Sequence, residues 1–274
     1  MTQRPAAPAP GFPVVPLPGA RLACTVRGTG PVALLAHGIT RSRAHEARYG
    51  LTDYAPVAAH HRLVAYDARG HGESGGRPEP ATYAWDALAG DLLALADHFS
   101  PEAPVAAIGC SMGTATALHA ALRAPERFFA LVLTAVPTAW ETRAAQAGLY
   151  RRMAALAADD PAALAALHAE APAPPVFGGR EQGGIDIRAS LLPAVLEGGG
   201  PPTSPADLPA PGALARITVP TLVLAWDTDP GHPVSTAETV AAHLPKARLS
   251  VARTAAEIED WGRVTADFLR EARG

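Results

Sequence analysis

The fold is decided by the stretch Val105-Ala106-Ala107-Ile108-Gly109-Cys110-Ser111-Met112-Gly113, which runs from an apolar segment into a helical pattern. Gly109 and Gly113 stand two residues before and two residues after Ser111. A strand-to-helix turn this tight is strained, and a side chain at either glycine would collide with neighbouring backbone. The turn lifts the serine hydroxyl out of the sheet and aims the free N–H groups of the helix at developing negative charge. The stretch therefore predicts that Ser111 is a nucleophile.

Strands and helices alternate on both sides of this turn. Further short strand-like runs occupy 21–27, 32–36, 62–66, 130–134, 221–226 and 247–252. Apolar residues at helical spacing predict helices at 85–99, 112–123, 236–244 and 261–270. Alternating strands and helices are typical of a mainly parallel sheet with right-handed crossovers.

One long segment interrupts the alternation. Residues 137–216 contain no convincing strand: the first half, 141–168, is rich in alanine and helical, and the second half is rich in proline and glycine. We expect this segment to be a helical cap, or lid, inserted between two core strands. The core then comprises 14–136 and 217–274, and the proline-rich residues before it form a loose N-terminus, 1–13.

Composition excludes several function classes. The 274 residues are 48% hydrophobic and carry a formal net charge of −3, without the basic stripe that a nucleic-acid or anionic-membrane partner needs. The two cysteines, Cys24 and Cys110, do not predict a disulfide framework. No apolar run reaches the length of a membrane span, and no signal core precedes the prolines, so we expect a soluble cytoplasmic protein. No histidine or cysteine cluster has metal-ligand spacing, and no cofactor or metal is predicted.

Three further segments accompany the turn at Ser111. The strand at 32–36 is followed by His37-Gly38, the next strand by Asp67-Ala68-Arg69-Gly70-His71-Gly72-Glu73-Ser74, and the strand at 221–226 by Asp227-Thr228-Asp229. Together with the turn they resemble the α/β-hydrolase family over about residues 14–269. The resemblance implies an eight-stranded, mostly parallel sheet with helices on both faces and a helical cap. It also accounts for the Gly70-x-Gly72-x-x-Gly75 run, which we do not interpret as a dinucleotide fingerprint.

The resemblance also implies an oxyanion hole. In the family, the residue after His-Gly and the residue after the nucleophile donate backbone N–H groups to the oxyanion. These residues are Ile39 and Met112 here. His37 would brace the oxyanion loop and would not be the catalytic base.

A serine nucleophile needs a base to take its proton and a carboxylate to orient that base. The family places the acid after the strand that follows the cap, where Asp229 fits best and Asp227 is the competitor. Some members carry the acid one strand earlier, where Glu141 is the candidate. Asp227 and Asp229 could also be simple turn residues.

The position of the catalytic base departs from the family pattern. The family places a histidine in the loop after the last strand. That loop, 253–261, has none, and no histidine follows His243. The first of four interpretations is that His232, three residues after Asp229, replaces the lost base. The others are a glutamate acting on water or substrate, a histidine from the cap or oxyanion side, and a site that no longer performs serine hydrolysis. The candidate glutamates are Glu257 and Glu259, and the candidate histidines from the cap or the oxyanion side are His45 and His168.

These inferences favour a serine hydrolase of a small carboxylic ester, lactone or thioester, similar to the small cap-bearing esterases and lactonases of this fold. Ser111, His232 and Asp229 would form the triad, with a small-molecule substrate as the partner. A non-hydrolytic enzyme on the same scaffold, such as a cyclase, decarboxylase, lyase or isomerase, is an alternative that would use the oxyanion pocket without a full triad. A binding protein without catalytic activity is the third possibility.

Overall fold

The computed structural model describes residues 12–171, 173–199 and 207–273. Most of the predicted loose N-terminus, and the glycine- and proline-rich end of the predicted cap at 200–206, lie outside the described residues. The predicted boundaries of core and cap stay predictions.

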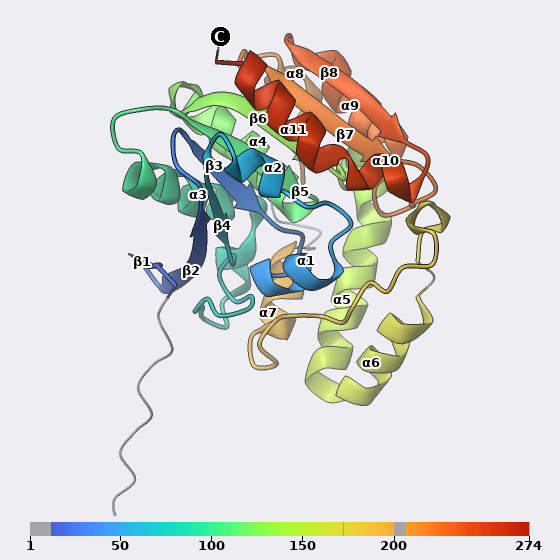
Figure 1. Cartoon of the computed structure of the whole chain (residues 1–274). Coiled ribbons are helices and arrows are strands. Elements are labelled where there is room, and N and C mark those ends of the chain that lie inside the picture. Colours follow the sequence, from blue (N-terminus) through green and yellow to red (C-terminus); the bar gives the residue numbers. More distant parts are fainter. Residues whose placement is uncertain (1–11, 172, 200–206, 274) are drawn as a thin grey trace, which may run out of the picture.

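The described residues form one eight-stranded sheet in the order β1-β2-β4-β3-β5-β6-β7-β8 (Figure 1). Its strands are β1 (Val14–Leu17), β2 (Ala20–Arg27), β3 (Val32–Ala36), β4 (Arg62–Tyr66), β5 (Val105–Cys110), β6 (Phe128–Thr134), β7 (Thr221–Trp226) and β8 (Ala247–Ala252). Adjacent strands from β4 to β8 are parallel, whereas β1 pairs antiparallel with β2 and β2 antiparallel with β4. The predicted eight-stranded, mostly parallel sheet is confirmed.

The pattern of apolar runs predicts seven of these strands and misses β1. This strand contains Pro16 and follows Pro13, so its sequence looks like an irregular proline-rich segment. Proline is tolerated there because β1 is the edge strand of the sheet that the described residues form, and one side of its backbone has no strand of that sheet to bond. Val15 is buried and anchors the strand to the core.

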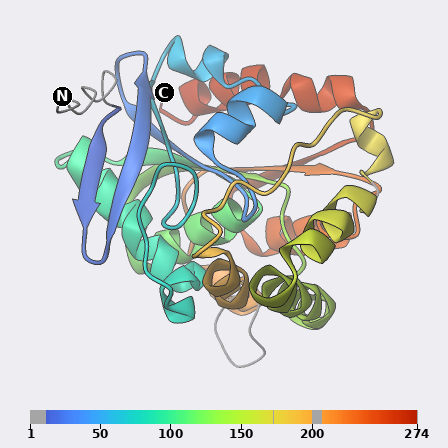
Figure 2. The same ribbon diagram turned by 90° about the horizontal axis from the view of Figure 1, so that it is seen from below.

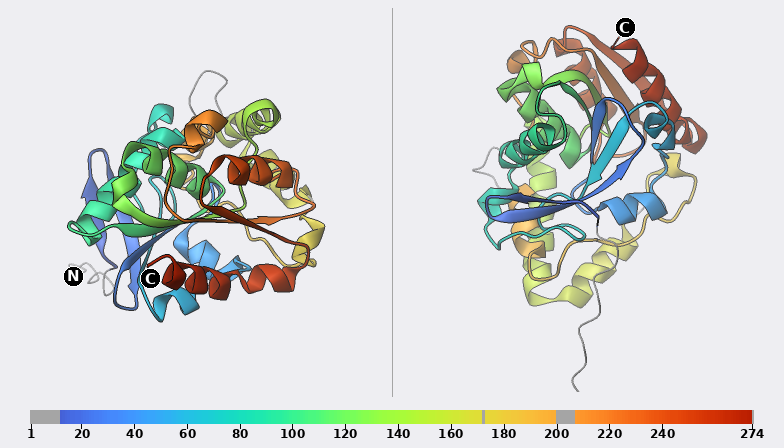
Figure 3. Two further views of the ribbon diagram at one scale, coloured as in Figure 1. Left: turned by 90° about the horizontal axis from the view of Figure 1, so that it is seen from above. Right: turned by 60° about the vertical axis from the view of Figure 1, so that its left-hand side comes forward.

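Helices cover both faces of the sheet, as predicted (Figure 3). One core cluster joins the sheet to α3 (Trp85–Phe99), α4 (Met112–Arg123) and α9 (Val234–His243). A second cluster joins the opposite face to α2 (Ala55–Ala58) and α11 (Trp261–Glu271). Central strands are therefore apolar on both sides, which is why β5, β6 and β7 have almost continuous apolar sequences.

Shorter elements connect these layers. Helix α1 (Arg43–Tyr49) follows β3, and α10 (Ala255–Glu259) follows β8. Two 3₁₀ turns, η1 (Pro80–Tyr83) and η2 (Pro125–Arg127), precede α3 and β6. No helix in the described part of the chain is long and apolar enough to cross a lipid bilayer.

The described residues between β6 and β7 form α5 (Arg143–Asp159), α6 (Pro161–Glu170), α7 (Leu192–Gly199), α8 (Pro211–Leu214), η3 (Trp140–Thr142) and η4 (Pro175–Phe177). Helices α5, α6 and α7 gather at one end of the sheet (Figures 1 and 2). An isolated β-bridge between Ile187 and His71 ties the loop before α7 to the loop after β4. The segment therefore packs against the loops that follow the strands.

Candidate active site

Ser111 occupies a strained turn between β5 and α4. Its backbone angles, φ 52° and ψ −108°, lie in a region that residues other than glycine seldom adopt. A Cβ atom on Gly109 would lie 2.4 Å from the backbone of Gly113, and one on Gly113 would lie 2.3 Å from the carbonyl oxygen of Ala36. Both glycines are therefore required by close backbone approach, which is the reason that the sequence pattern predicts.

Two threonines, to which no sequence motif points, also support this turn. The Ser111 N–H donates to the carbonyl oxygen of Thr134 at the end of β6 (3.0 Å). The Thr134 hydroxyl donates to the carbonyl oxygen of Gly109 (3.0 Å). The Thr114 hydroxyl lies 2.9 Å from the Gly109 carbonyl oxygen and 2.8 Å from that of Thr134. These bonds tie the turn to the neighbouring strand and fix the direction of the serine side chain.

His232 lies beside the Ser111 hydroxyl. Its Nε2 atom is 2.9 Å from Ser111 Oγ, and its Nδ1 atom is 2.7 Å from Asp229 Oδ2. A carboxylate only accepts hydrogen bonds, so Nδ1–H donates to Asp229 and Nε2 is left to accept from the serine hydroxyl. The geometry matches the requirement for a nucleophile, a base and an orienting acid in line.

The loop between β7 and α9 brings acid and base together within one turn. The His232 N–H donates to the carbonyl oxygen of Asp229 (3.1 Å), which closes the turn. The Gly231 N–H donates to Asp229 Oδ1 (2.8 Å) and fixes the carboxylate. Asp227, the competing acid, bonds through its backbone N–H to the carbonyl oxygen of Ala252, and no recorded contact joins its side chain to His232 within the described residues.

The environment of Asp229 keeps its carboxyl group ionised. Burial by itself raises the pKa of this group, but the hydrogen bond and the charge interaction with His232, with further bonds from Trp226 and Gly231, hold the pKa at about 2. An ionised Asp229 can stabilise the imidazolium that forms when His232 takes a proton.

Trp226 supports both members of this pair, a role that the sequence did not reveal. Its indole N–H donates to Asp229 Oδ2 (2.9 Å), and its ring meets the His232 ring edge to face at a centroid distance of 5.6 Å. The same indole stacks on Trp261 at a centroid distance of 5.5 Å, with 8° between the planes. The only signal in the sequence is its position at the end of the strand that leads to the acid.

The predicted oxyanion amides flank the serine turn. Met112 is the first residue of α4, so its N–H precedes the hydrogen-bonded part of the helix, and Ile39 lies in the loop after β3. Within the described part of the chain neither amide has a recorded acceptor. Both are therefore available to hold a negatively charged oxygen.

His37 fixes the peptide that carries the Ile39 N–H. Its Nε2 accepts from the Ala68 N–H (2.9 Å), so the proton is on Nδ1, which donates to the carbonyl oxygen of Gly38 (2.7 Å). The Gly38 carbonyl and the Ile39 N–H belong to one peptide unit, so this bond sets the direction of the amide. Burial lowers the pKa of His37 to about 3, and the ring stays neutral. His71 adds a bond from Nε2 to the Ile39 carbonyl oxygen (2.6 Å).

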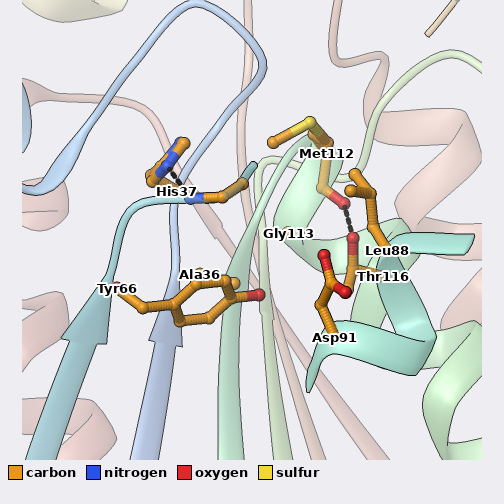
Figure 4. A pocket seen from close by; sticks show the side chains of 9 residues that line it. Ala36, His37, Tyr66, Leu88, Asp91, Met112, Gly113 and Thr116 are labelled. Carbon is orange, nitrogen blue, oxygen red and sulfur yellow. Dashed lines mark hydrogen bonds between the residues drawn. The ribbon is translucent and has the colours of Figure 1, made fainter. Parts of the chain in front are cut away.

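A packed cluster lies behind these amides (Figure 4). It includes Met112 and Thr116 of α4, Asp91 of α3 and Tyr66 of β4. The Thr116 hydroxyl donates to the Met112 carbonyl oxygen (2.9 Å). The space among the side chains is too small for a water-sized sphere, so the cluster supports the turn and does not bind a ligand.

Among the described residues, none of the other candidate bases has a recorded hydrogen bond to Ser111. Glu257 accepts from the N–H groups of Arg253 (2.6 Å) and Thr254 (3.0 Å) and so caps α10. Glu259 pairs with Arg180 on the surface. His45 accepts from Arg41 at 3.0 Å, and His168 donates to the carbonyl oxygen of Gly183 at 3.2 Å. Glu141, the alternative acid, is exposed in η3.

Ser111 and His232 open onto a cavity of about 1740 Å³. Its walls come from the loops after the strands, from α1, and from the segment between β6 and β7. The segment between β6 and β7 contributes the side chains of Tyr150, Leu164, Phe177 and Leu192. The described residues contain no group of three or more histidine, cysteine, aspartate or glutamate side chains arranged to hold a metal ion.

Solved structures of similar fold cover nearly the whole chain. A hydrolase from Pseudomonas aeruginosa PA01 is 23% identical with a TM-score of 0.76, covering 97% of this chain and 99% of its own. An esterase from the thermophile Thermogutta terrifontis is 23% identical with a TM-score of 0.71 (93% and 95% covered). The enol-lactonase from Burkholderia xenovorans LB400 is 22% identical with a TM-score of 0.68 (94% and 100% covered). At these identities the likeness shows the fold alone.

A comparison with curated protein sequences finds no match. The family assignment comes from a model of the alpha/beta hydrolase fold, which matches residues 31–258. The matched region contains the turn at Ser111, the two predicted oxyanion residues and the Asp229–His232 turn. The chain therefore belongs to the alpha/beta hydrolase fold family.

Proposed function

We propose that the protein is a serine hydrolase of a small carboxylic ester, lactone or thioester. One observation carries the proposal: His232 bridges the Ser111 hydroxyl, at 2.9 Å, and the Asp229 carboxylate, at 2.7 Å. A base within hydrogen-bonding reach is the feature that the sequence left in doubt. Membership of the alpha/beta hydrolase fold family supports the same class of reaction.

The reaction begins with acyl transfer to the enzyme. Ser111 Oγ attacks the carbonyl carbon while His232 Nε2 takes the hydroxyl proton. The carbonyl oxygen becomes an oxyanion, held by the N–H groups of Ile39 and Met112. When the tetrahedral intermediate collapses, the bond to the leaving oxygen or sulfur breaks, and His232 returns the proton to that atom. The acyl group stays on Ser111.

Water then releases the acid. His232 takes a proton from a water molecule, which attacks the acyl carbon, and the same two amides hold the second oxyanion. Collapse breaks the bond to Ser111 Oγ, and His232 gives the proton back to the serine. In a lactone the leaving hydroxyl remains attached to the acid, so the product is one hydroxy acid.

The cavity lining favours a largely apolar substrate. Aromatic and aliphatic side chains dominate the wall that α5, α6, η4 and α7 provide, and we propose that residues 137–216 act as a cap over the nucleophile. The similar structures include an esterase and an enol-lactonase, activities that belong to those proteins and support the choice of substrate class here.

A non-hydrolytic enzyme and a binding protein are less well supported than a serine hydrolase. A non-hydrolytic enzyme or a binding protein was favoured by the lack of a histidine after the last strand. His232 supplies an imidazole at the right place from a different loop, so a full triad is available and serine hydrolysis is the better supported function.

A fluorophosphonate probe tests the proposal. We expect rapid labelling of the wild type and none of Ser111→Ala, together with turnover of p-nitrophenyl esters by the wild type alone. Ser250→Ala, a serine exposed on β8, is the matched control and should be labelled like the wild type. Equal labelling of Ser111→Ala and wild type, or no labelling of either, would reject a serine nucleophile.

A further inference from the structure

Glu46 faces the cavity with its carboxyl group unmatched. It lies on α1 and lines the same cavity as Ser111. Among the described residues no hydrogen bond or ion pair to its side chain is recorded, although its backbone N–H bonds to Ser42. Most charged side chains elsewhere in the cavity wall have partners; Arg43, for example, pairs with Asp67 and Glu73.

The neighbouring cation, Arg41, directs its recorded hydrogen bonds to groups other than Glu46. The Arg41 guanidinium, which attracts the Glu46 charge, donates to the carbonyl oxygen of Gln182 at 2.7 Å and to its side-chain oxygen at 3.1 Å. It also bonds to His45 at 3.0 Å. Among the described residues, none of the hydrogen bonds recorded for Arg41 goes to Glu46.

Glu46 lies close to the reacting serine. Burial, and next to it the charge of Glu46, raise the pKa of the Cys110 thiol to about 12. Cys110 immediately precedes Ser111, and the charge of Asp229 acts on the same thiol. Glu46 and Asp229 thus both lie near the turn that carries the nucleophile, within reach of a substrate bound there.

The Glu46 side chain is half-buried and has no recorded partner among the described residues. Burial raises the pKa of Glu46, because the surroundings disfavour its charged form. A desolvated polar group without a partner destabilises a protein, and such groups are few in native structures. What the side chain lacks is a hydrogen-bond donor, and the open side from which one can come is the cavity.

We propose that Glu46 binds a hydrogen-bond-donating group of the substrate, a hydroxyl or an ammonium, and so determines which esters or lactones the enzyme accepts. The inference rests on the proposed hydrolase function for the identity of the ligand. It makes Glu46 the polar anchor in a mostly apolar cavity. A hydroxyl needs only an acceptor oxygen, whereas an ammonium needs the negative charge of the carboxylate. A variant that keeps the oxygen and removes the charge therefore distinguishes a hydroxyl from an ammonium.

Matched esters test the proposal. The probes are p-nitrophenyl butanoate, hexanoate and octanoate, each compared with the same ester carrying a terminal hydroxyl or a terminal ammonium. In the wild type we expect one donor-bearing ester to have a kcat/KM about 10- to 100-fold above its plain counterpart, the size of a hydrogen bond to a charged group. Glu46→Leu should abolish this preference. Glu46→Gln should keep it for a hydroxyl and lose it for an ammonium. Glu126→Gln, exposed in η2, is the matched control and should keep the wild-type preference.

Binding without turnover separates this proposal from the proposed function. In a Ser111→Ala background, calorimetry should show the same preference for the donor-bearing ester, and Glu46→Leu should remove it, whether or not the wild type hydrolyses any ester. The melting temperature of Glu46→Leu should equal or exceed that of the wild type, because an unmatched carboxyl group is removed. The proposal is wrong if donor-bearing esters bind no better than plain ones, or if Glu46→Leu weakens all esters equally and lowers the melting temperature.

Discussion

Asp229 and His232 are three residues apart on one turn, and the imidazole of the second donates to the carboxylate of the first at 2.7 Å. The same short loop therefore supplies both the orienting acid and the candidate base. A hydrogen bond between the His232 N–H and the Asp229 carbonyl oxygen closes the turn. The loop after β8 has a different task, since its glutamate caps α10.

Replacing His232 should abolish ester hydrolysis without unfolding the protein. In His232→Ala no group remains to take the Ser111 proton, so we expect kcat to fall by about 10³-fold or more, while KM changes little. Steady-state turnover of a p-nitrophenyl ester measures the effect. His243→Ala, an exposed histidine at the end of α9, is the control and should keep wild-type kcat. If His232→Ala retained full turnover, another group would have to be the base.

The ionisation of Asp229 should make the free energy of unfolding depend on pH in a defined range. The pKa of Asp229 falls from 3.8 to about 2 on folding, so the ionised group stabilises the fold above pH 3.8, and this contribution is lost as the pH falls towards 2. The full contribution is about 2 kcal/mol. Urea unfolding measures it: the free energy of unfolding of Asp229→Asn should lie below that of the wild type at pH 6, and the gap should narrow between pH 4 and 2. If Asp227→Asn showed this narrowing and Asp229→Asn did not, the acid would be misassigned.

Removing the indole N–H of Trp226 should slow catalysis while leaving the cavity intact. Trp226→Phe keeps an aromatic ring in contact with His232 and Trp261 but removes the 2.9 Å bond to Asp229 Oδ2. We expect kcat to fall by about 10-fold with little change in KM, because the bond positions the acid and does not touch the substrate. Trp140→Phe is the matched control: its indole N–H donates to the carbonyl oxygen of Pro209, outside the cavity wall. A change confined to KM would mean that Trp226 acts on the substrate.

The sequence predicts the fold well because its signals are local. Apolar runs and glycines at Gly109 and Gly113 report directly on buried strands and on close backbone approach. The partner of Ser111 is not a local property. His232 is 121 residues away along the chain, and whether it or another histidine meets the serine depends on how β5 and β7 are placed in the sheet. Trp226 escaped notice for the same reason, since its contribution depends on the direction of one indole N–H.

The turn at Ser111 should be intolerant of a single methyl group at Gly113. A Cβ atom there would lie 2.3 Å from the Ala36 carbonyl oxygen and 2.8 Å from the Ala36 side chain, so β3 and α4 would have to move apart. We expect Gly113→Ala to lower the free energy of unfolding by about 3 kcal/mol or more, because both elements are packed in the core. Gly148→Ala in α5, where the nearest atom is the end of the Arg151 side chain at 3.9 Å, is the matched control. It should raise stability by about 0.5–1 kcal/mol, since alanine is favoured over glycine within a helix. Urea denaturation of both variants measures the contrast, and equal stability of Gly113→Ala and the wild type would show that the turn can relax away from the strand.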